Sequence, residues 1–323
     1  MKIGIVGASG EVGMMMIRCL EEYEILVKEL RLFASSRSAG KKIKFKNEVL
    51  IVEELTEESM QESFDYLLFS AGSKVSKKFA PIAAEAGNTI IDNSSAFRRD
   101  EKIPLIVPEI NGDLLQNYKG IIANPNCSTI QLVLALKPLD THYHIQKVLV
   151  TTFQSVSGAG HKGIMTLEEQ RLGSYENGDF PRHIDLNVIP QIGEISEEGY
   201  CEEEEKIHYE CRRILDRADM EICATVTRVP VMYGHSESVF VQFEKEVEIY
   251  KVCNVLKKAP AVKYAEKYMT AYELKNSNDS HVSRIRHAYD SHSIQFWNVA
   301  NNVRLGAAAN AVKIMKHMIE SDV

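Results

Sequence analysis

Short apolar runs alternate with amphipathic segments through the first part of the chain. The apolar runs are residues 2–6 (KIGIV), 30–34 (LRLFA), 49–52, 65–70 (DYLLFS) and 88–92 (NTIID). Helical patterns at 11–22, 54–62 and 74–86 separate them. Strands that are apolar on both faces and alternate with helices are typical of a parallel sheet covered on both sides. The pattern therefore predicts an α/β domain that binds its ligands at the carboxyl ends of the strands.

The pattern changes near residue 145. Residues 147–155, 221–229 and 238–248 look like longer, half-alternating strands with fewer helices between them, and 199–216 looks like a polar helix. This predicts a second, α+β domain with a mixed sheet. The tail at 303–320 is an Ala-rich amphipathic helix that we expect to return to the first domain. The expected domains are 1–126 plus 302–323, and 127–301.

Length and charge agree with a two-domain enzyme. The chain has 323 residues, of which 45% are hydrophobic and 26% charged, and its formal charge is −7. An acidic balance argues against a general nucleic-acid binder. No apolar run approaches the roughly 20 residues of a membrane span, and the N-terminus does not resemble a signal peptide. We therefore expect a cytoplasmic protein that binds neither nucleic acid nor membrane.

Six cysteines occur in the chain, and none belongs to a CxxC pair, so no metal site and no dithiol motif is expected. Cys127 differs from the others because it directly follows an Asn-Pro-Asn turn. For the other five cysteines we expect small, buried hydrophobic side chains. They are Cys19, Cys201, Cys211, Cys223 and Cys253.

A glycine-rich turn, GASGEVG, follows the first predicted strand directly. Gly7, Gly10 and Gly13 allow a tight turn and a close approach of a pyrophosphate to a helix N-terminus. The spacing differs from the common GxGxxG, and an ordinary strand–helix turn is the alternative. Because the turn lies at the first strand–helix junction, it favours a Rossmann-type dinucleotide-binding domain.

The end of the second predicted strand bears on the choice of cofactor. NAD enzymes usually have Asp or Glu there, which binds the ribose 2′-hydroxyl. Here the segment from Ser35 to Lys41 offers hydroxyls and cations but no carboxylate. A guanidinium such as that of Arg37 suits a 2′-phosphate. The segment therefore favours NADP over NAD, with an ordinary basic surface turn as the alternative.

Cys127 follows a short apolar strand and the turn Asn124-Pro125-Asn126. Turn residues before a long apolar segment indicate that Cys127 lies at the N-terminus of a helix, where free N–H groups favour the thiolate. A thiolate beside a nicotinamide can attack a carbonyl and form a thioester after hydride transfer. By itself this position leaves a buried structural thiol as the better interpretation.

The sequence motifs before and after Cys127 resemble those of one enzyme family. NPNCST is similar to the nucleophile motif of aspartate-semialdehyde dehydrogenases, and so are GASGEVG, SSRSAGK, DNSSAFR, VPEIN, QSVSGAG, NVIPQIG, RVPVMYGHSE and GAAANAV. The resemblance covers nearly the whole chain. It implies NADPH-dependent reduction of β-aspartyl phosphate to aspartate β-semialdehyde and phosphate, in lysine, threonine and methionine biosynthesis. It also implies a homodimer or dimer of dimers assembled through the second domain.

The same resemblance implies the roles of individual residues. Cys127 is the nucleophile, His235 the general acid/base, and Gln154 orients the reacting carbonyl. Arg228 binds the substrate α-carboxylate and Glu203 its ammonium, although Glu203 lies in a run of four glutamates. Lys206 and Arg98 bind phosphate. Expected cofactor contacts are Gly7, Ser9, Gly10, Glu11, Val12, Ser35, Ser36, Arg37, Ser38, Ser157, Gly158 and Asn302.

One segment departs from the family pattern, which has an acidic residue before Asn302 and a lysine before the GAA sequence. Asn301 and Leu305 stand at these two positions. We interpret this as the loss of one ion pair with little effect on the chemistry.

Two other functions stay open at this point. A reductase of N-acetylglutamyl phosphate shares the architecture and a catalytic Cys and His, although QSVSGAG and RVPVMYGH fit it less well. A non-catalytic NADP-binding paralogue is the alternative from another class, and the joint presence of Cys127, His235, Gln154 and Arg228 argues against it.

Overall fold

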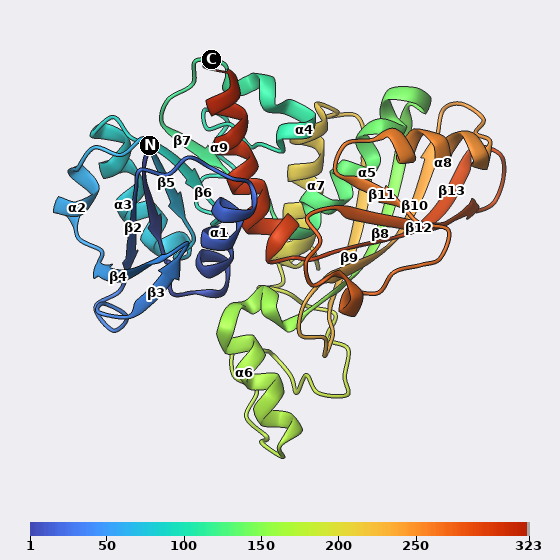
Figure 1. The fold of residues 1–323 in the computed structure, drawn as a ribbon. Helices are drawn as coiled ribbons and strands as arrows, with labels where there is room; N and C mark the ends of the chain where they lie inside the picture. Colours follow the sequence, from blue (N-terminus) through green and yellow to red (C-terminus); the bar gives the residue numbers. More distant parts are fainter. Residues whose placement is uncertain (322–323) are drawn as a thin grey trace. The chain divides into compact units, whose positions relative to one another are not determined.

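The computed structural model describes residues 1–321 and divides into two compact units. Unit 1 comprises Met1–Asn126 and the chain from Ala307 onward, and unit 2 comprises Cys127–Gly306 (Figure 1). We expected the chain to return to the first domain at residue 302. Unit 2 extends to Gly306 instead, and the side chains of Asn301 and Asn302 form their hydrogen bonds inside it.

Unit 1 is built on a seven-stranded sheet within the described residues, in the order β3-β4-β2-β1-β5-β6-β7. The strands are β1 Lys2–Val6, β2 Glu29–Ala34, β3 Lys42–Phe45, β4 Glu48–Glu54, β5 Tyr66–Phe69, β6 Thr89–Asp92 and β7 Ile121–Ala123. All neighbours are parallel except β3 and β4. We expected a basic turn at 35–42; β3 begins at the end of it, because Ile43 and Phe45 alternate with lysines and turn inward.

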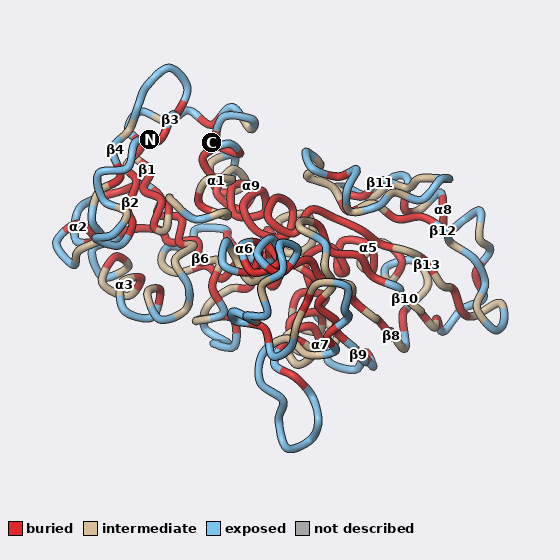
Figure 2. Tube along the Cα trace, turned by 90° about the horizontal axis from the view of Figure 1, so that it is seen from below, coloured by how far each residue is buried: buried red, intermediate tan, exposed pale blue. Residues whose placement is uncertain are grey.

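Two apolar layers cover the two faces of this sheet. The helices are α1 Glu11–Glu22, α2 Glu57–Gln61, α3 Ser73–Glu85, α4 Pro108–Asn111 and α9 Asn310–Ser321, with a 3-10 turn at Gly112–Leu115. One layer joins Ile3 and Ile5 to Met16 of α1 and Met315 of α9. The other joins residues of β5 to α2 and α3. The buried turns of α1 and α9 are red in Figure 2.

Unit 2 is built on a mixed sheet in the order β11-β12-β13-β10-β8-β9. Its strands are β8 Ile145–Gln154, β9 Glu221–Arg228, β10 His235–Phe243, β11 Val262–Tyr264, β12 Ser280–His287 and β13 Ser293–Ala300. The pairs β8–β9 and β11–β12 are parallel, and the others are antiparallel. The mixed sheet and the parallel sheet of unit 1 confirm the predicted fold class.

Helices cover one face of the mixed sheet. They are α5 Cys127–Tyr143, α7 Glu202–Leu215 and α8 Ile249–Lys258, while α6 Gly160–Arg171 lies apart with the 3-10 turn Val156–Ala159; a further 3-10 turn is Ala271–Leu274. α5 contacts α7, α8 and the four central strands β12, β13, β10 and β8. Its residues 128–136 are all buried, so its apolar run has no polar face.

Two sequence expectations need correction in unit 2. The strand expected at 238–248 is β10, which begins three residues earlier at His235 and ends at Phe243. Cys223 was expected to be buried but is exposed, because β9 alternates and Cys223 lies on its outward face. The other four structural cysteines are buried, as expected. No helix among residues 1–321 has both the length and the apolar character that a membrane crossing requires.

Candidate functional site

The turn between β1 and α1 has the geometry that a dinucleotide phosphate requires. Gly7 has φ +86°, and its N–H and that of Ala8 donate to the carbonyl of Phe33. A Cβ on Gly13 would lie 2.2 Å from the Gly7 carbonyl oxygen, so only glycine lets α1 approach this turn. Gly10 precedes α1 and brings no capping side chain. The helix N-terminus therefore presents backbone N–H groups, which fit a pyrophosphate. Ser9, Glu11 and Val12 belong to this turn and the first residues of α1.

The segment after β2 has room and charge for a phosphate. Ser35, Ser36 and Arg37 are exposed, and Ser38 is half-buried. The Ser35 carbonyl accepts from the N–H of Ser38 at 2.8 Å, so the segment folds into a turn. An exposed guanidinium in a hydroxyl-rich turn fits a 2′-phosphate better than a ribose hydroxyl pair.

Arg98 lies in unit 1 and is tied to the segment that leads into Cys127. Its Nε donates to the carbonyl of Asn124 at 2.8 Å, and Nη2 donates to the carbonyl of Asn93 at 2.7 Å. Asn124 also bonds to Asn310 of α9 through its side chain. Arg98 is only 8% exposed. The guanidinium is thus positioned by the backbone three residues before the cysteine.

Cys127 is the first residue of α5, as the sequence predicted for a cysteine after an Asn-Pro-Asn turn. Its side chain is partly exposed, unlike the nine residues that follow it. A Cβ on Gly306 would lie 2.6 Å from the Cys127 Cβ, so Gly306 leaves the space that the cysteine occupies. The helix N-terminus favours a thiolate at this position.

His235 is the first residue of β10 and is completely buried. The backbone N–H of Ser155 donates to Nδ1 at 3.0 Å. Because an N–H group can only donate, Nδ1 carries the lone pair and the neutral ring has its proton on Nε2. Nε2 has no hydrogen-bond partner among residues 1–321. The ring therefore presents an N–H donor that no part of the described chain uses.

The electrostatic surroundings keep His235 neutral. Burial, followed by the positive charge of Arg228, lowers its pKa from 6.5 to about 3, and Glu203 opposes this shift. Burial also lowers the pKa of Arg228, while the negative charges of Glu203 and Cys127 raise it. Cys127 and His235 therefore both lie within electrostatic range of Arg228.

Arg228 ends β9 and is 6% exposed. Its Nη1 donates to the carbonyl of Ser155 at 2.8 Å, so Ser155 holds both Arg228 and His235. A Cβ on Gly158 would lie 2.6 Å from Arg228 Nη1 and 3.4 Å from His235 Nε2. The glycine thus keeps the space in front of both side chains open.

Gln154 connects this group to α7. Its Nε2 donates to Glu203 Oε1 at 3.0 Å, and Lys206 Nζ lies 3.3 Å from Glu203 Oε2. Glu203 is 5% exposed, whereas its neighbour Glu202 is exposed. Within the glutamate run, Glu203 is therefore the carboxylate that faces the site residues of unit 2.

Asn302 lies in the same group. Its Oδ1 accepts from the N–H of Gly234 at 2.8 Å, and its amide bonds to Ser157 Oγ and Ser155 Oγ. Asn302 is thereby joined to the turn before His235 and to the QSVSGAG loop. The structure thus brings Ser157 and Asn302 together, although 145 residues separate them.

The substituted positions near Asn302 are both buried, and neither needs a charged partner. Asn301 Nδ2 donates to the carbonyl of Lys275, and Oδ1 accepts from the N–H groups of Val303 and Arg304. Leu305 is fully buried in the π-helical turn Arg304–Ala309. Asn301 therefore organises the start of this turn through hydrogen bonds, in place of an ion pair.

Sequence reasoning did not find Ser155 or Gly306. Ser155 stands between Gln154 and Ser157 in a motif that was already singled out, but only the fold shows that its N–H fixes the tautomer of His235. Gly306 precedes the Ala-rich tail and lies 179 positions after Cys127, so no local signal indicated their contact.

Comparison with known proteins gives the site its context. Residues 2–118 match the family model described as the semialdehyde dehydrogenase NAD binding domain, and residues 136–305 match the semialdehyde dehydrogenase dimerisation domain. Aspartate-semialdehyde dehydrogenase of Campylobacter jejuni is 41% identical, over 99% of this chain and 97% of that protein. The chain belongs to the aspartate-semialdehyde dehydrogenase family.

Other members of the family show the same full-length similarity. The Bacillus subtilis aspartate-semialdehyde dehydrogenase is 39% identical over 98% of this chain and 96% of that protein. A crystal structure of aspartate semialdehyde dehydrogenase II from Vibrio cholerae, complexed with ASA, has a TM-score of 0.95 at 39% identity and covers 99% of this chain and 98% of that chain. Aspartate-semialdehyde dehydrogenases reduce aspartyl phosphate to the semialdehyde, and the chain is accordingly a nicotinamide-dependent dehydrogenase.

Proposed function

We propose that this aspartate-semialdehyde dehydrogenase reduces β-aspartyl phosphate through a thioester on Cys127 and uses NADPH in preference to NADH. The observation that carries the proposal is the position of Arg228. This buried cation lies within electrostatic range of both Cys127 and Glu203, and it shares Ser155 with His235. A substrate with a carboxylate, an ammonium and an acyl phosphate has a matching group for each of these side chains.

Substrate binding assigns one charge to each side chain. Arg228 takes the α-carboxylate in a forked geometry that a lysine cannot reproduce. Glu203 takes the ammonium and is held by Gln154 and Lys206. Lys206 and Arg98 take the phosphate. These contacts hold the acyl carbon against the sulfur of Cys127.

Acyl transfer begins at Cys127. The thiolate attacks the acyl carbon, a C–S bond forms, and the C–O bond to phosphate breaks. The departing phosphate takes a proton from water and remains as the dianion beside the cations. Gln154 donates a hydrogen bond to the carbonyl oxygen as negative charge develops on it. The product of this step is a β-aspartyl thioester.

His235 supplies the proton in the second half of the reaction. Within residues 1–321 the Nε2–H of the free enzyme points to no partner, and burial, followed by the charge of Arg228, keeps the histidine pKa low. Neutralising Arg228 with the substrate carboxylate removes the second of these causes and raises the histidine pKa. The ring donates its proton to the oxygen that becomes negative when the thioester is reduced. As the thiohemiacetal collapses, the C=O bond forms, the C–S bond breaks, the proton on oxygen returns to His235, and Cys127 leaves as the thiolate.

The residues for the cofactor fit a dinucleotide with a 2′-phosphate. When bound, the nicotinamide supplies the hydride that reduces the thioester carbonyl. Gly7, Ser9, Gly10, Glu11 and Val12 would hold the pyrophosphate, and Ser35, Ser36, Arg37 and Ser38 would hold the 2′-phosphate. Ser157, Gly158 and Asn302 would hold the nicotinamide side.

We also propose that the enzyme works as a homodimer, or as a dimer of dimers, through unit 2. The match of residues 136–305 to a dimerisation domain supports this. The mixed sheet has a face without helices that carries Leu149 and the paired rings of Phe153 and Trp297, with centroids 5.7 Å apart. A cavity of about 390 Å³ beside Val231 and Trp297 adds further apolar surface. A cytoplasmic location and a place in lysine, threonine and methionine biosynthesis remain predictions.

Substrate and cofactor are tested in one assay. The purified enzyme should reduce NADP when given aspartate semialdehyde and phosphate, and the rate should fall at least about tenfold with NAD, as expected for one lost guanidinium–phosphate pair. N-acetylglutamate semialdehyde should give no reaction. Equal rates with NAD would remove the cofactor assignment, and a preference for the N-acetylated substrate would remove the assignment of Glu203 to an ammonium.

A further inference from the structure

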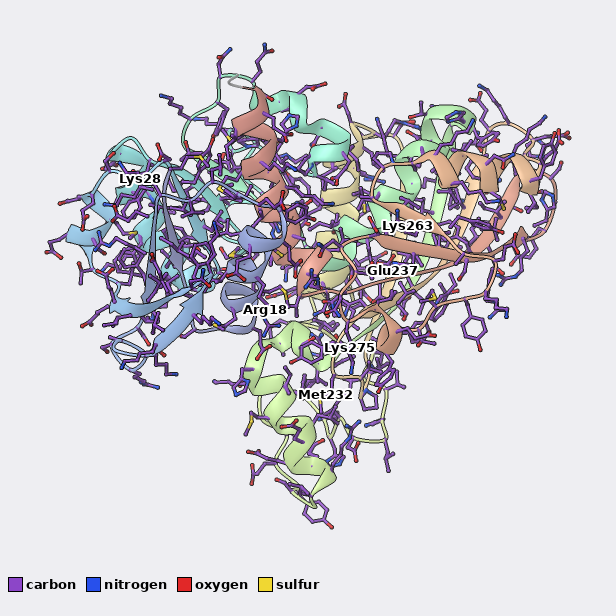
Figure 3. All side chains as sticks on the ribbon, viewed as in Figure 1. Arg18, Lys28, Met232, Glu237, Lys263 and Lys275 are labelled. Carbon is purple, nitrogen blue, oxygen red and sulfur yellow. The ribbon has the colours of Figure 1, made fainter. Side chains whose placement is uncertain are left out.

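A fully buried carboxyl group lies two residues after His235 on β10. Glu237 is 0% exposed, and Figure 3 labels it among the strands of unit 2. Residues two apart on a strand face the same side of the sheet, so Glu237 shares its face with His235. This face carries α5, the helix that Cys127 begins.

Gln131 is the residue of α5 that meets this carboxyl. It lies four positions after Cys127, so it occupies the same face of the helix one turn further on. Its Nε2 donates to the backbone carbonyl of His235 at 3.4 Å, and its side chain is also within hydrogen-bond reach of Glu237. The helix of the nucleophile and the strand of the histidine are thus joined by one amide.

Asn298 of β13 closes the network. Its Nδ2 donates to Glu237 Oε2 at 2.9 Å and to the backbone carbonyl of Gln131 at 3.0 Å. Its Oδ1 accepts from Ser280 Oγ at 2.6 Å. Both protons of this amide are used, so Asn298 has no further donor to offer the carboxyl.

Two oxygens of this network lack a hydrogen-bond donor. Glu237 Oε1 and Gln131 Oε1 are both buried, and neither has a hydrogen-bond partner within residues 1–321. Turning the Gln131 amide over would point its oxygen at the carbonyl of His235, where two acceptors repel. A proton on Glu237 gives both oxygens a partner, because the acid O–H can donate to Gln131 Oε1.

We propose that Glu237 is a neutral carboxylic acid in the working enzyme, and that it positions Cys127 and His235 relative to each other through Gln131. Glu237 is a positioning residue, because it touches no reacting atom. The inference rests on the proposed roles of Cys127 and His235. The protonation of Glu237, and its hydrogen bond to the amide of Gln131, do not depend on those roles.

The surroundings of Glu237 favour its acid form. Burial raises its pKa from 4.5 to about 8, against the hydrogen bonds from Gln131 and Asn298. The titratable groups near it are Cys211 of α7 and, on its own strand, the neutral His235. Burial, followed by the charge of Glu210, raises the pKa of the Cys211 thiol, which therefore stays uncharged. The groups named here provide no cation that would stabilise a carboxylate.

Infrared spectroscopy of the whole enzyme tests the protonation directly. At pH 6.5 the wild type should show the C=O stretch of a protonated carboxyl, which disappears as the pH rises through about 8 and is absent from Glu237→Gln. Glu210→Gln, at a second buried glutamate, is the matched control and should retain the Glu237 band. Absence of the band from the wild type, or its persistence in Glu237→Gln, would overturn the proposal whether or not the enzyme has the proposed activity.

Kinetics test the positioning role. Wild-type kcat should fall about tenfold between pH 8 and pH 9.5, in proportion to the acid form, with little change in KM. In Glu237→Gln the amide donates to Gln131 Oε1 and accepts from Asn298, so this loss should vanish. Glu237→Leu should have a low kcat at every pH, and the glutamine variant should recover it. An unchanged alkaline limb in Glu237→Gln, or a glutamine variant as inactive as the leucine variant, would contradict the role.

Discussion

The two units of this enzyme prepare for their ligands in different ways. Unit 1 presents backbone: a glycine turn with φ +86°, the N-terminus of α1 and a short exposed turn after β2. Its sheet lies between two apolar layers. Unit 2 presents side chains: His235, Arg228, Glu203 and Gln154 are buried and bonded to one another or to Ser155.

This difference follows from what each site must do. Backbone N–H groups that point at one place bind a phosphate well, whatever the side chains are. Unit 1 therefore needs only the right backbone conformation in its glycine turn. Proton transfer and charge recognition need particular atoms at particular places, and burying them requires a partner for every polar group. Variants in unit 2 should therefore have larger effects on the reaction than variants in unit 1.

The largest effect is expected at Cys127. Cys127→Ala removes the nucleophile and should lower kcat by roughly 10⁴-fold or more, with unfolding little changed. Initial rates of NADP reduction and thermal unfolding measure the two quantities. Cys223→Ala, at an exposed cysteine of the same unit, is the control and should keep full activity. Comparable rates in both variants would show that unit 2 does not work through this thiol.

Arg228→Lys should lower kcat/KM about 100-fold, because lysine cannot keep both the bond to Ser155 and a forked contact with a carboxylate. Steady-state kinetics with aspartate semialdehyde give the value. Arg286→Lys, on an exposed arginine of β12, should match the wild type. If the two variants have the same kcat/KM, a positive charge at position 228 is enough to bind the substrate carboxylate. Unit 2 would then depend less on particular side-chain atoms than we infer.

The pH dependence of stability separates the buried groups. The folded-state pKa of His235 is lowered, so the unfolded state binds more protons between pH 6.5 and 3, and the wild type loses stability as pH falls through that window. Between pH 7.5 and 4.5 this loss is roughly 3 kcal/mol, and His235→Asn should lack it. Urea unfolding of both proteins at the two pH values measures the difference. If the free energies of unfolding of the two proteins differ by the same amount at both pH values, His235 is not held neutral.

The smallest effect is expected in unit 1. Arg37→Ala should lower kcat/KM for NADPH about tenfold and leave the value for NADH unchanged, because only the 2′-phosphate loses a partner. Lys77→Ala, at an exposed residue of α3, serves as the control. Equal losses with both cofactors would show that Arg37 does not read the 2′-phosphate.

The same contrast explains how much the sequence could predict. In unit 1 the parallel strands are apolar on both faces and the glycines act locally, so these strands and the glycine turn before α1 followed from pattern alone. β3 did not, because it lies at the end of a basic segment. In unit 2 Cys127 was placed at a helix start by three preceding residues. The start of β10 was missed, because His235 and Ser236 are buried polar residues and polar residues carry no strand signal.

The remainder depends on contacts between residues distant in sequence. The tautomer of His235 is set by Ser155, 80 positions away, and Asn298 meets Gln131 across 167 positions. No periodicity encodes such pairs. The family resemblance indicated the residues to which we assign the chemistry, and the fold added Ser155 and Gly306, which contact them.

The central claim is that the acyl group is carried by Cys127. It is tested most directly by mixing the enzyme with β-aspartyl phosphate in the absence of nicotinamide, quenching in acid, and locating the modification by mass spectrometry. The account predicts one aspartyl group on the peptide that contains Cys127, and none on the peptide with the exposed Cys223. An unmodified Cys127 peptide under conditions where phosphate is released, or a label on Cys223 instead, would contradict it.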